Sequence, residues 1–138
     1  MARAVDVVHE VFSRLGRGDE SVLDELVAED YVNHAATPQG REGWRETIHH
    51  VGSDLRRTGT DIHHLFGDDE YACLHMTMRG VHEASTMPLL TGVAVTGREV
   101  TWEYIHIFRV ANGQLAEHWA ARDDVGLLRQ VGAWPPPA

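Results

Sequence analysis

The chain has 138 residues and a formal net charge of −9, with 43% hydrophobic and 24% charged residues. This length suits one folded domain with one hydrophobic core, so we expect a single domain over residues 1–138. The acidic balance argues against nucleic acid and anionic membranes as partners, because binding to phosphate groups needs a basic patch. No apolar run approaches the roughly 18 residues of a membrane-spanning helix. No signal-peptide pattern opens the chain, so we expect a cytoplasmic protein.

Helices are predicted in the first part of the chain. Residues 3–15 place apolar side chains at three- and four-residue steps, which is typical of an amphipathic helix. A short second helix begins near Ser21. After a bend at residues 31–34, a third helix covers about 41–56, with Trp44 on its apolar stripe.

The second part of the chain alternates between apolar and polar residues, as strands do. Residues 61–66 predict a short strand and 71–81 a longer one. Residues 84–97 are expected to form a loop with a short strand, and 125–131 a last helical turn or two. Helices followed by antiparallel strands indicate an α+β fold. Helices laid on one face of a curved sheet leave a hollow, where small ligands usually bind.

The strongest local signal is Asn112-Gly113 between two apolar-rich runs, which predicts a β-hairpin with a two-residue turn. Counting outward from this turn places Trp102 opposite Asp123 and His106 opposite Trp119. Because side chains alternate between the two faces of a strand, one face collects the aromatic residues and a single carboxylate. That face carries Trp102, Tyr104, His106, Phe108, Trp119 and Asp123.

The other face of the hairpin carries Glu103 opposite Arg122, together with Ile105 and Ile107. The charged pair is interpreted as structural, because exposed pairs contribute little to stability. The isoleucines indicate that this face is covered by a second subunit, so we expect a homodimer or homotetramer.

Asp123 is the candidate general acid and base. An ordinary aspartate has a pKa of about 3.9, too low for removing a proton next to a carbonyl group, and burial beside tryptophans raises it. The alternative is that the Asp123-Asp124 pair caps the last helix. Two adjacent aspartates allow both, with Asp123 facing inward and Asp124 capping.

His106 is a second candidate, either as a hydrogen-bond donor to a substrate carbonyl or as a core histidine. The regular register separates it from Asp123 by about 13 Å along the strands, so the two form a dyad only if a bulge shifts the pairing. Asn33 and His34 either shape a turn or reach substrate oxygens. Four aromatic residues either pack in the core or stack on a flat substrate. They are Trp44, Trp102, Tyr104 and Trp119.

Other chemistries find little support. The cationic side chains are all arginines, so a Schiff-base aldolase mechanism, which needs a lysine, is excluded. The chain has no His-Glu-x-x-His motif and a single cysteine, Cys73. His63, His75 and His82 could meet across strands, but adjacent pairs of histidines point to different faces. We expect no metal and no cofactor.

Several motifs together resemble the SnoaL-like polyketide cyclases, a family of the nuclear transport factor two-like superfamily, and the likeness runs through nearly the whole chain in order. Its most specific part is His118-Trp119, then Asp123, then a Gly-Leu-Leu segment. This chain departs from the family pattern at Ala94-Val95, where many members have a proline, and at Arg122 and Asp124. The remaining motifs are Tyr31-Val32-Asn33-His34, Gly40-Arg41-Glu42-Gly43, Thr96-Gly97-Arg98 and Ile105-His106-Ile107-Phe108-Arg109.

The resemblance implies a cone-shaped barrel of a curved antiparallel sheet wrapped around N-terminal helices and enclosing a pocket. It also implies a cofactor-independent enzyme that closes a ring of a small aromatic, polyketide-like substrate by intramolecular aldol condensation. Asp123 matches the family's catalytic acid/base. Two alternatives stay open, because one fold hosts many functions. One is a cofactor-free hydroxylase of an aromatic polyketide, and the other is a binding module without catalysis. A strongly exposed Asp123 would favour the latter.

Overall fold

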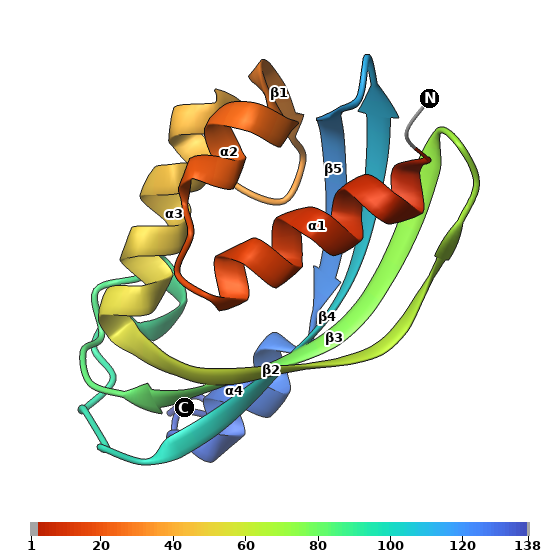
Figure 1. The fold of residues 1–138 in the computed structure, drawn as a ribbon. Helices are drawn as coiled ribbons and strands as arrows, with labels where there is room; N and C mark the ends of the chain where they lie inside the picture. The colour runs from red at the N-terminus through yellow and green to blue at the C-terminus, as the bar shows by residue number, and fades with distance from the viewer. Residues whose placement is uncertain (1–2, 138) are drawn as a thin grey trace.

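The computed structural model describes residues 3–137 and has an α+β architecture (Figure 1). Three N-terminal helices and a curved sheet lie opposite one another, and α1 crosses the concave side of the sheet. The helices are α1 (Ala4–Gly16), α2 (Ser21–Leu26), α3 (Gly40–Asp54) and α4 (Asp124–Gln130), with a 3₁₀ turn η1 (Pro88–Leu90). The strands are β1 (Val27–Asn33), β2 (Leu55–Gly67), β3 (Tyr71–His82), β4 (Glu99–Ala111) and β5 (Gln114–Arg122).

The five strands form one sheet in the order β1-β5-β4-β3-β2. The predicted fold class is confirmed: a curved sheet wraps around N-terminal helices. Two details differ from the expected barrel. The sheet is open, and β1 pairs with β5 in parallel while the other neighbours are antiparallel. The parallel strand places the Asn33 region beside β5.

The helices cover the sheet through their apolar sides. Val8, Val11 and Leu15 on α1 are buried, together with Leu74 and Phe108 of the sheet. Each such side chain contributes about 1.5–3 kcal/mol when fully buried, so this contact stabilises the packing of α1 on the sheet. None of the helices in residues 3–137 is long and apolar enough to cross a membrane.

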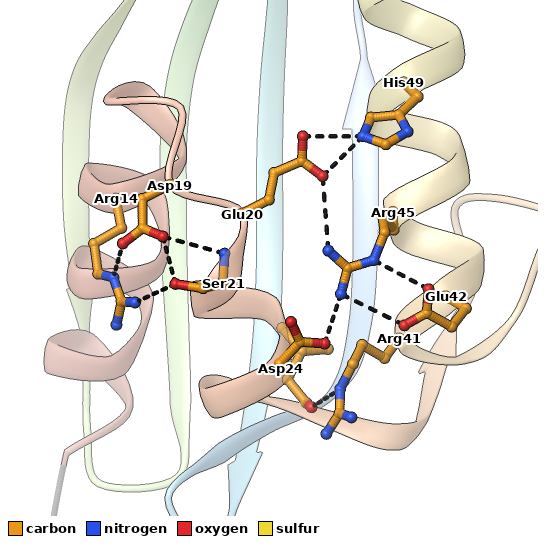
Figure 2. Close-up of polar contacts among 10 residues, drawn as sticks. Arg14, Asp19, Glu20, Ser21, Asp24, Arg41, Glu42, Arg45 and His49 are labelled. Carbon is orange, nitrogen blue, oxygen red and sulfur yellow. Dashed lines mark hydrogen bonds and ion pairs between the residues drawn. The ribbon is translucent and has the colours of Figure 1, made fainter.

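A network of charged side chains connects α2 and α3 (Figure 2). Arg45 on α3 donates to Glu42 and Asp24 at 3.0 and 2.7 Å and lies 3.7 Å from Glu20. His49 contacts the same Glu20 carboxylate at 2.8 and 2.9 Å. Exposed ion pairs add little stability individually. The contacts with Arg45 and His49 nevertheless hold the carboxylate of Glu20 in place, because both side chains share it.

A buried carboxylate at the end of α3 holds the loop that follows β3. Asp54 is 0% exposed, and its oxygens accept hydrogen bonds from the backbone N–H and hydroxyl of Thr86 at 2.8 and 2.7 Å and from the N–H of Met87 at 2.7 Å. Charge-assisted bonds of this kind are among the stronger ones in proteins. Asp54 therefore anchors the segment around η1, where the sequence predicted a loop with a short strand.

Replacing Asp54 by alanine is expected to destabilise the fold by on the order of 3 kcal/mol, because buried donors lose their acceptor. Chemical denaturation of both proteins measures this difference. The matched control is Asp69→Ala, since the Asp69 side chain is 84% exposed and contacts Arg3 at 3.3 Å. We expect that variant to lose less than about 1 kcal/mol. Equal losses in the two variants would contradict the anchoring role of Asp54.

Candidate active site

A cavity of about 880 Å³ lies between the inner face of the sheet and the helices. This volume is within the usual range for small-molecule sites. Its wall is mainly aromatic and apolar, with a few polar groups. The aromatic and methionine side chains of the wall are Phe12, Trp44, Trp102, Tyr104, Met76, Met78 and Met87.

A β-bulge in β5 decides which side chains of the hairpin face the cavity. The turn itself is as predicted: Asn112 and Gly113 have φ values of 53° and 74°, and Ala111 pairs with Gln114. The register shifts by one residue between the Val110–Leu115 pair and the Arg109–Glu117 pair, so Ala116 is the extra residue on β5. A shift by one residue exchanges the two faces of a strand.

The regular register predicted from the sequence is therefore wrong beyond the bulge. His106 pairs with Ala120 instead of Trp119, and Tyr104 pairs with Arg122. The inner face of β4 is as predicted, whereas β5 presents its other side chains. His118, Ala120 and Arg122 line the cavity.

Trp119 and His34, two predicted substrate-binding residues, lie outside the cavity wall. Their rings stack on each other at 5.0 Å, and His34 Nε2 is 2.7 Å from a carboxylate oxygen of Glu117. Trp119 instead borders a shallow depression with Ile105 and Ile107 on the outer face of the sheet. The bulge explains this placement, because it turns Trp119 outward and His118 inward.

The two aspartates after β5 do not have their predicted roles: Asp123 provides the cap, and Asp124 contacts Trp102 and Arg122 without lining the cavity. Asp123 is exposed, and its carboxylate caps α4 by accepting the N–H of Gly126 at 2.8 Å. Asp124 accepts the indole N–H of Trp102 at 3.1 Å and lies 3.5 Å from Nε of Arg122. The expectation that Asp123 faces inward is wrong, since the bulge reverses the count. Asp123 does not line the cavity, and its acid/base role stays a prediction.

The other candidates from the sequence do meet in one place. Asn33, Trp44, Trp102, Tyr104 and His106 all line the cavity. The rings of Trp102, Tyr104 and His106 follow one another along β4, with centroids 5.0 Å apart at each step. The wall of β4 is thus a continuous aromatic surface that ends in an imidazole.

A chain of hydrogen bonds connects the polar groups of this wall. The side-chain oxygen of Asn33 accepts the backbone N–H of Ala35 at 2.9 Å, which fixes the orientation of the amide. His118 Nδ1 lies 2.9 Å from the same oxygen, and His118 Nε2 lies 2.8 Å from His106 Nδ1. The side chains of Asn33, His118 and His106, which these hydrogen bonds join, are all buried.

These contacts determine which ring nitrogens carry hydrogen. An amide oxygen only accepts, so His118 donates through Nδ1, and a neutral His118 then accepts through Nε2. His106 therefore donates through Nδ1, which leaves its Nε2 with a lone pair. This Nε2 is buried and has no hydrogen-bond partner in residues 3–137. The ring of His106 lies at the cavity wall, but neighbouring side chains cover its unpaired Nε2.

Burial keeps both rings neutral. It lowers the pKa of His106 to about 3, and the neighbouring His118 and Arg122 act in the same direction. It also lowers the pKa of His118 to about 4, with Arg122 and His34 adding to the effect. Neutral rings are what the hydrogen-bond chain requires, because an imidazolium has no acceptor nitrogen.

Sequence reasoning missed His118 and Arg122 as cavity residues. The expectation of a single carboxylate on the aromatic face overlooked one signal: the same regular register places Glu117 opposite Phe108 on that face. An unpaired carboxylate in a core is costly, and a bulge that turns it outward removes the conflict. In the structure Glu117 forms an ion pair with Arg109 at 2.9 Å, and Glu103, which was expected to pair with Arg122, contacts His75 at 2.7 Å.

His63, His64 and His75 gather on the outer face of β2 and β3. The rings of His63 and His64 lie 4.8 and 5.2 Å from that of His75, so the expectation that this adjacent pair points to different faces is wrong. His64 and His75 contact each other at 3.0 Å, whereas His82 is fully buried and contacts Thr96 and Ser85. In the described part of the chain, no group of at least three His, Cys, Asp or Glu side chains is arranged to hold a metal ion.

Comparison with known proteins identifies the family. The sequence model of the family described as SnoaL-like polyketide cyclase matches residues 2–131. The chain belongs to the SnoaL-like polyketide cyclase family. Its resemblance to these proteins, expected from the motifs, is thereby confirmed.

Individual relatives within and around this family are distant in sequence but similar in structure. The chain is 25% identical over 148 aligned residues to the aklanonic acid methyl ester cyclase DauD of Streptomyces sp. (strain C5), covering 99% of this chain and 87% of that protein. TsrD from Streptomyces laurentii superposes with a TM-score of 0.80 at 26% identity, covering 96% of this chain and 98% of that one. IdmH from Streptomyces antibioticus, a candidate polyketide cyclase, has a TM-score of 0.76 at 27% identity, covering 92% and 96%.

The buried histidines predict how stability depends on pH. Both groups have a lower pKa in the folded chain than the ordinary value of 6.5, so the unfolded chain binds more protons as the pH falls below about 6.5. Stability is then lost on acidification, by at most roughly 1.4 kcal/mol per pH unit for each group. His106→Gln removes one group and is expected to flatten this dependence. Urea denaturation between about pH 7 and 4.5 measures it, and parallel profiles of variant and wild type would contradict the neutral state of His106.

Proposed function

We propose that this chain is a polyketide cyclase that closes a ring by intramolecular aldol condensation, with His106 as the proton acceptor. The observation that carries the proposal is the unpaired Nε2 of His106, whose tautomer is set by His118 and Asn33. Family membership supports the class of reaction. The exposed position of Asp123 alone would favour a binding module, but the unpaired Nε2 of His106 beside the cavity supplies a base once side-chain movement uncovers it.

The reaction begins at a carbon that lies between two carbonyl groups of the substrate. His106 Nε2 takes the proton of this carbon, and the electron pair of the C–H bond moves into the enolate. The enolate carbon then forms a bond to a second carbonyl carbon of the same molecule. The electron pair of that C=O becomes an alkoxide, which takes the proton back from His106.

With a pKa of about 3, the free His106 is a weak base, so this step requires the enolate to raise that pKa. A lone imidazolium is unfavourable in a buried cavity, which is why burial lowers the pKa. Proton transfer from a bound substrate creates an enolate beside the imidazolium. The pair of opposite charges costs less in the cavity than an isolated cation does, because each charge stabilises the other.

We assign the stabilisation of the enolate oxygen to Tyr104. Its ring stacks on His106 with a centroid distance of 5.0 Å. Burial raises the pKa of Tyr104, so its hydroxyl keeps the proton at neutral pH and can donate it as a hydrogen bond. The aromatic wall excludes water and offers a flat surface for stacking.

Substitution of His106 by glutamine tests the assignment, with aklanonic acid methyl ester, the substrate named for DauD, as the first probe. We expect ring closure and deuterium exchange of the acidic C–H in D₂O to fall by about 100-fold or more, since a general base contributes that much. Mass spectrometry follows both signals.

The matched controls are His34→Gln and Asp123→Asn, which change residues outside the cavity wall. Both variants are expected to keep the wild-type rate. Loss of turnover in Asp123→Asn together with full activity in His106→Gln would return the acid/base role to Asp123.

An oxygen electrode separates ring closure from hydroxylation, because an aldol reaction consumes no oxygen. We expect product to form at the same rate in anaerobic and aerated buffer. Product formation that requires oxygen and consumes it stoichiometrically would assign the chain to the cofactor-free hydroxylases, with the same base generating the carbanion.

A further inference from the structure

The cavity contains an arginine that the ring-closing steps do not use. Arg122 is the last residue of β5, pairs with Tyr104 on β4 and lines the cavity. Its side chain is 36% exposed, so the guanidinium is reachable from the cavity and from solvent. A charged group on an otherwise aromatic wall determines which substrates bind there.

Neighbouring side chains hold the guanidinium of Arg122 in place but leave its hydrogen-bond donors without acceptors. Its central carbon lies 5.5 Å from the centre of the Trp102 ring, and its Nε lies 3.5 Å from Asp124 Oδ1. The same Asp124 oxygen accepts the indole N–H of Trp102 at 3.1 Å, which holds the carboxylate on that side. Within residues 3–137, no hydrogen bond involves the guanidinium of Arg122, although an arginine has five N–H donors. Its terminal nitrogens are therefore available to a ligand.

The other charged groups of the cavity wall are less suited to an anion. Arg57 donates to the backbone oxygen of Leu15 at 3.0 Å. Glu20 is shared by His49 and Arg45, as Figure 2 shows, and Glu46 on α3 is exposed. Arg122 is the cation that lies on the aromatic wall of β4, over Trp102, where a flat aromatic substrate would stack.

The position of Arg122 keeps a negatively charged substrate group away from the carbon that loses its proton. The Tyr104–Arg122 pair is two strand positions from the His106–Ala120 pair, or about 7 Å. The guanidinium lies over Trp102, which is farther from His106 along β4. An enolate oxygen stays within two bonds of the carbon that loses its proton, next to His106. The anion that meets Arg122 is therefore a separate, permanent one.

We propose that Arg122 forms a carboxylate-binding subsite, so that this chain prefers a flat aromatic substrate with a free carboxylate over the corresponding methyl ester. A guanidinium binds a carboxylate through two parallel N–H···O bonds, which an ester cannot match. The preference distinguishes this chain from a cyclase named for a methyl ester. As a statement about the substrate it rests on the proposed function, but the binding itself requires no turnover.

Equilibrium binding of two unreactive probes tests the subsite: anthraquinone-2-carboxylate and its methyl ester, followed by quenching of tryptophan fluorescence. We expect the wild type to bind the carboxylate about tenfold more tightly than the ester, the range of a charged hydrogen bond. Arg122→Gln is expected to weaken carboxylate binding about tenfold and to leave ester binding unchanged. Arg17→Gln, at an exposed position away from the cavity wall, is the control and keeps the preference.

Two further measurements keep the result interpretable. Arg122→Lys retains the charge without the planar fork, so it should show an intermediate preference even if Arg122→Gln fails to fold. His106→Gln should keep the preference, which separates this subsite from the ring-closing chemistry. Equal binding of both probes by the wild type would overturn the proposal. So would equal weakening of both probes in Arg122→Gln, or loss of the preference in Arg57→Gln instead.

Discussion

The bulge at Ala116 is the constraint on which the candidate site depends. Without it, the hairpin would place the carboxylate of Glu117 opposite Phe108 in the core, where an unpaired charge costs several kcal/mol. With it, Glu117 reaches Arg109 on the outer face, and His118 takes the inner position. The local cost of one unpaired strand residue is small by comparison. The same bulge therefore removes the charge of Glu117 from the core and places His118 in the cavity wall.

The parallel strand β1 completes what the bulge begins. It brings Asn33 beside His118 in the sheet, and the amide oxygen of Asn33 then sets the tautomer of His118 and, through it, that of His106. The amide is itself oriented by the N–H of Ala35. Groups on β1 and on the β4–β5 hairpin, which are distant in sequence, thus determine one lone pair. A series of hydrogen bonds of this kind restricts the orientations of the buried side chains that it joins.

Sequence reasoning reached the fold class because its signals are local. The helix predicted at 41–56 is observed at Gly40–Asp54, and the Asn112-Gly113 turn forms as the dipeptide requires. It missed β1 (Val27–Asn33), since this strand follows a helix without a turn signal and pairs with a strand that is distant in the chain. The cavity residues of β4 were predicted from the alternation alone. Those of β5 were not, because one bulge exchanges all faces beyond it.

Burial gives the proposed base a selectivity that an exposed histidine lacks. With its pKa near 3, His106 takes no proton from water at neutral pH and stays a free acceptor. It gains affinity for a proton only when the proton's departure leaves an anion in the same cavity, because the two charges then stabilise each other. Arg122, turned toward Trp102, does not have to stabilise that anion. Its charge lowers the pKa of His106 further, so a carboxylate bound at Arg122 would offset this effect and strengthen the base when the substrate is in place.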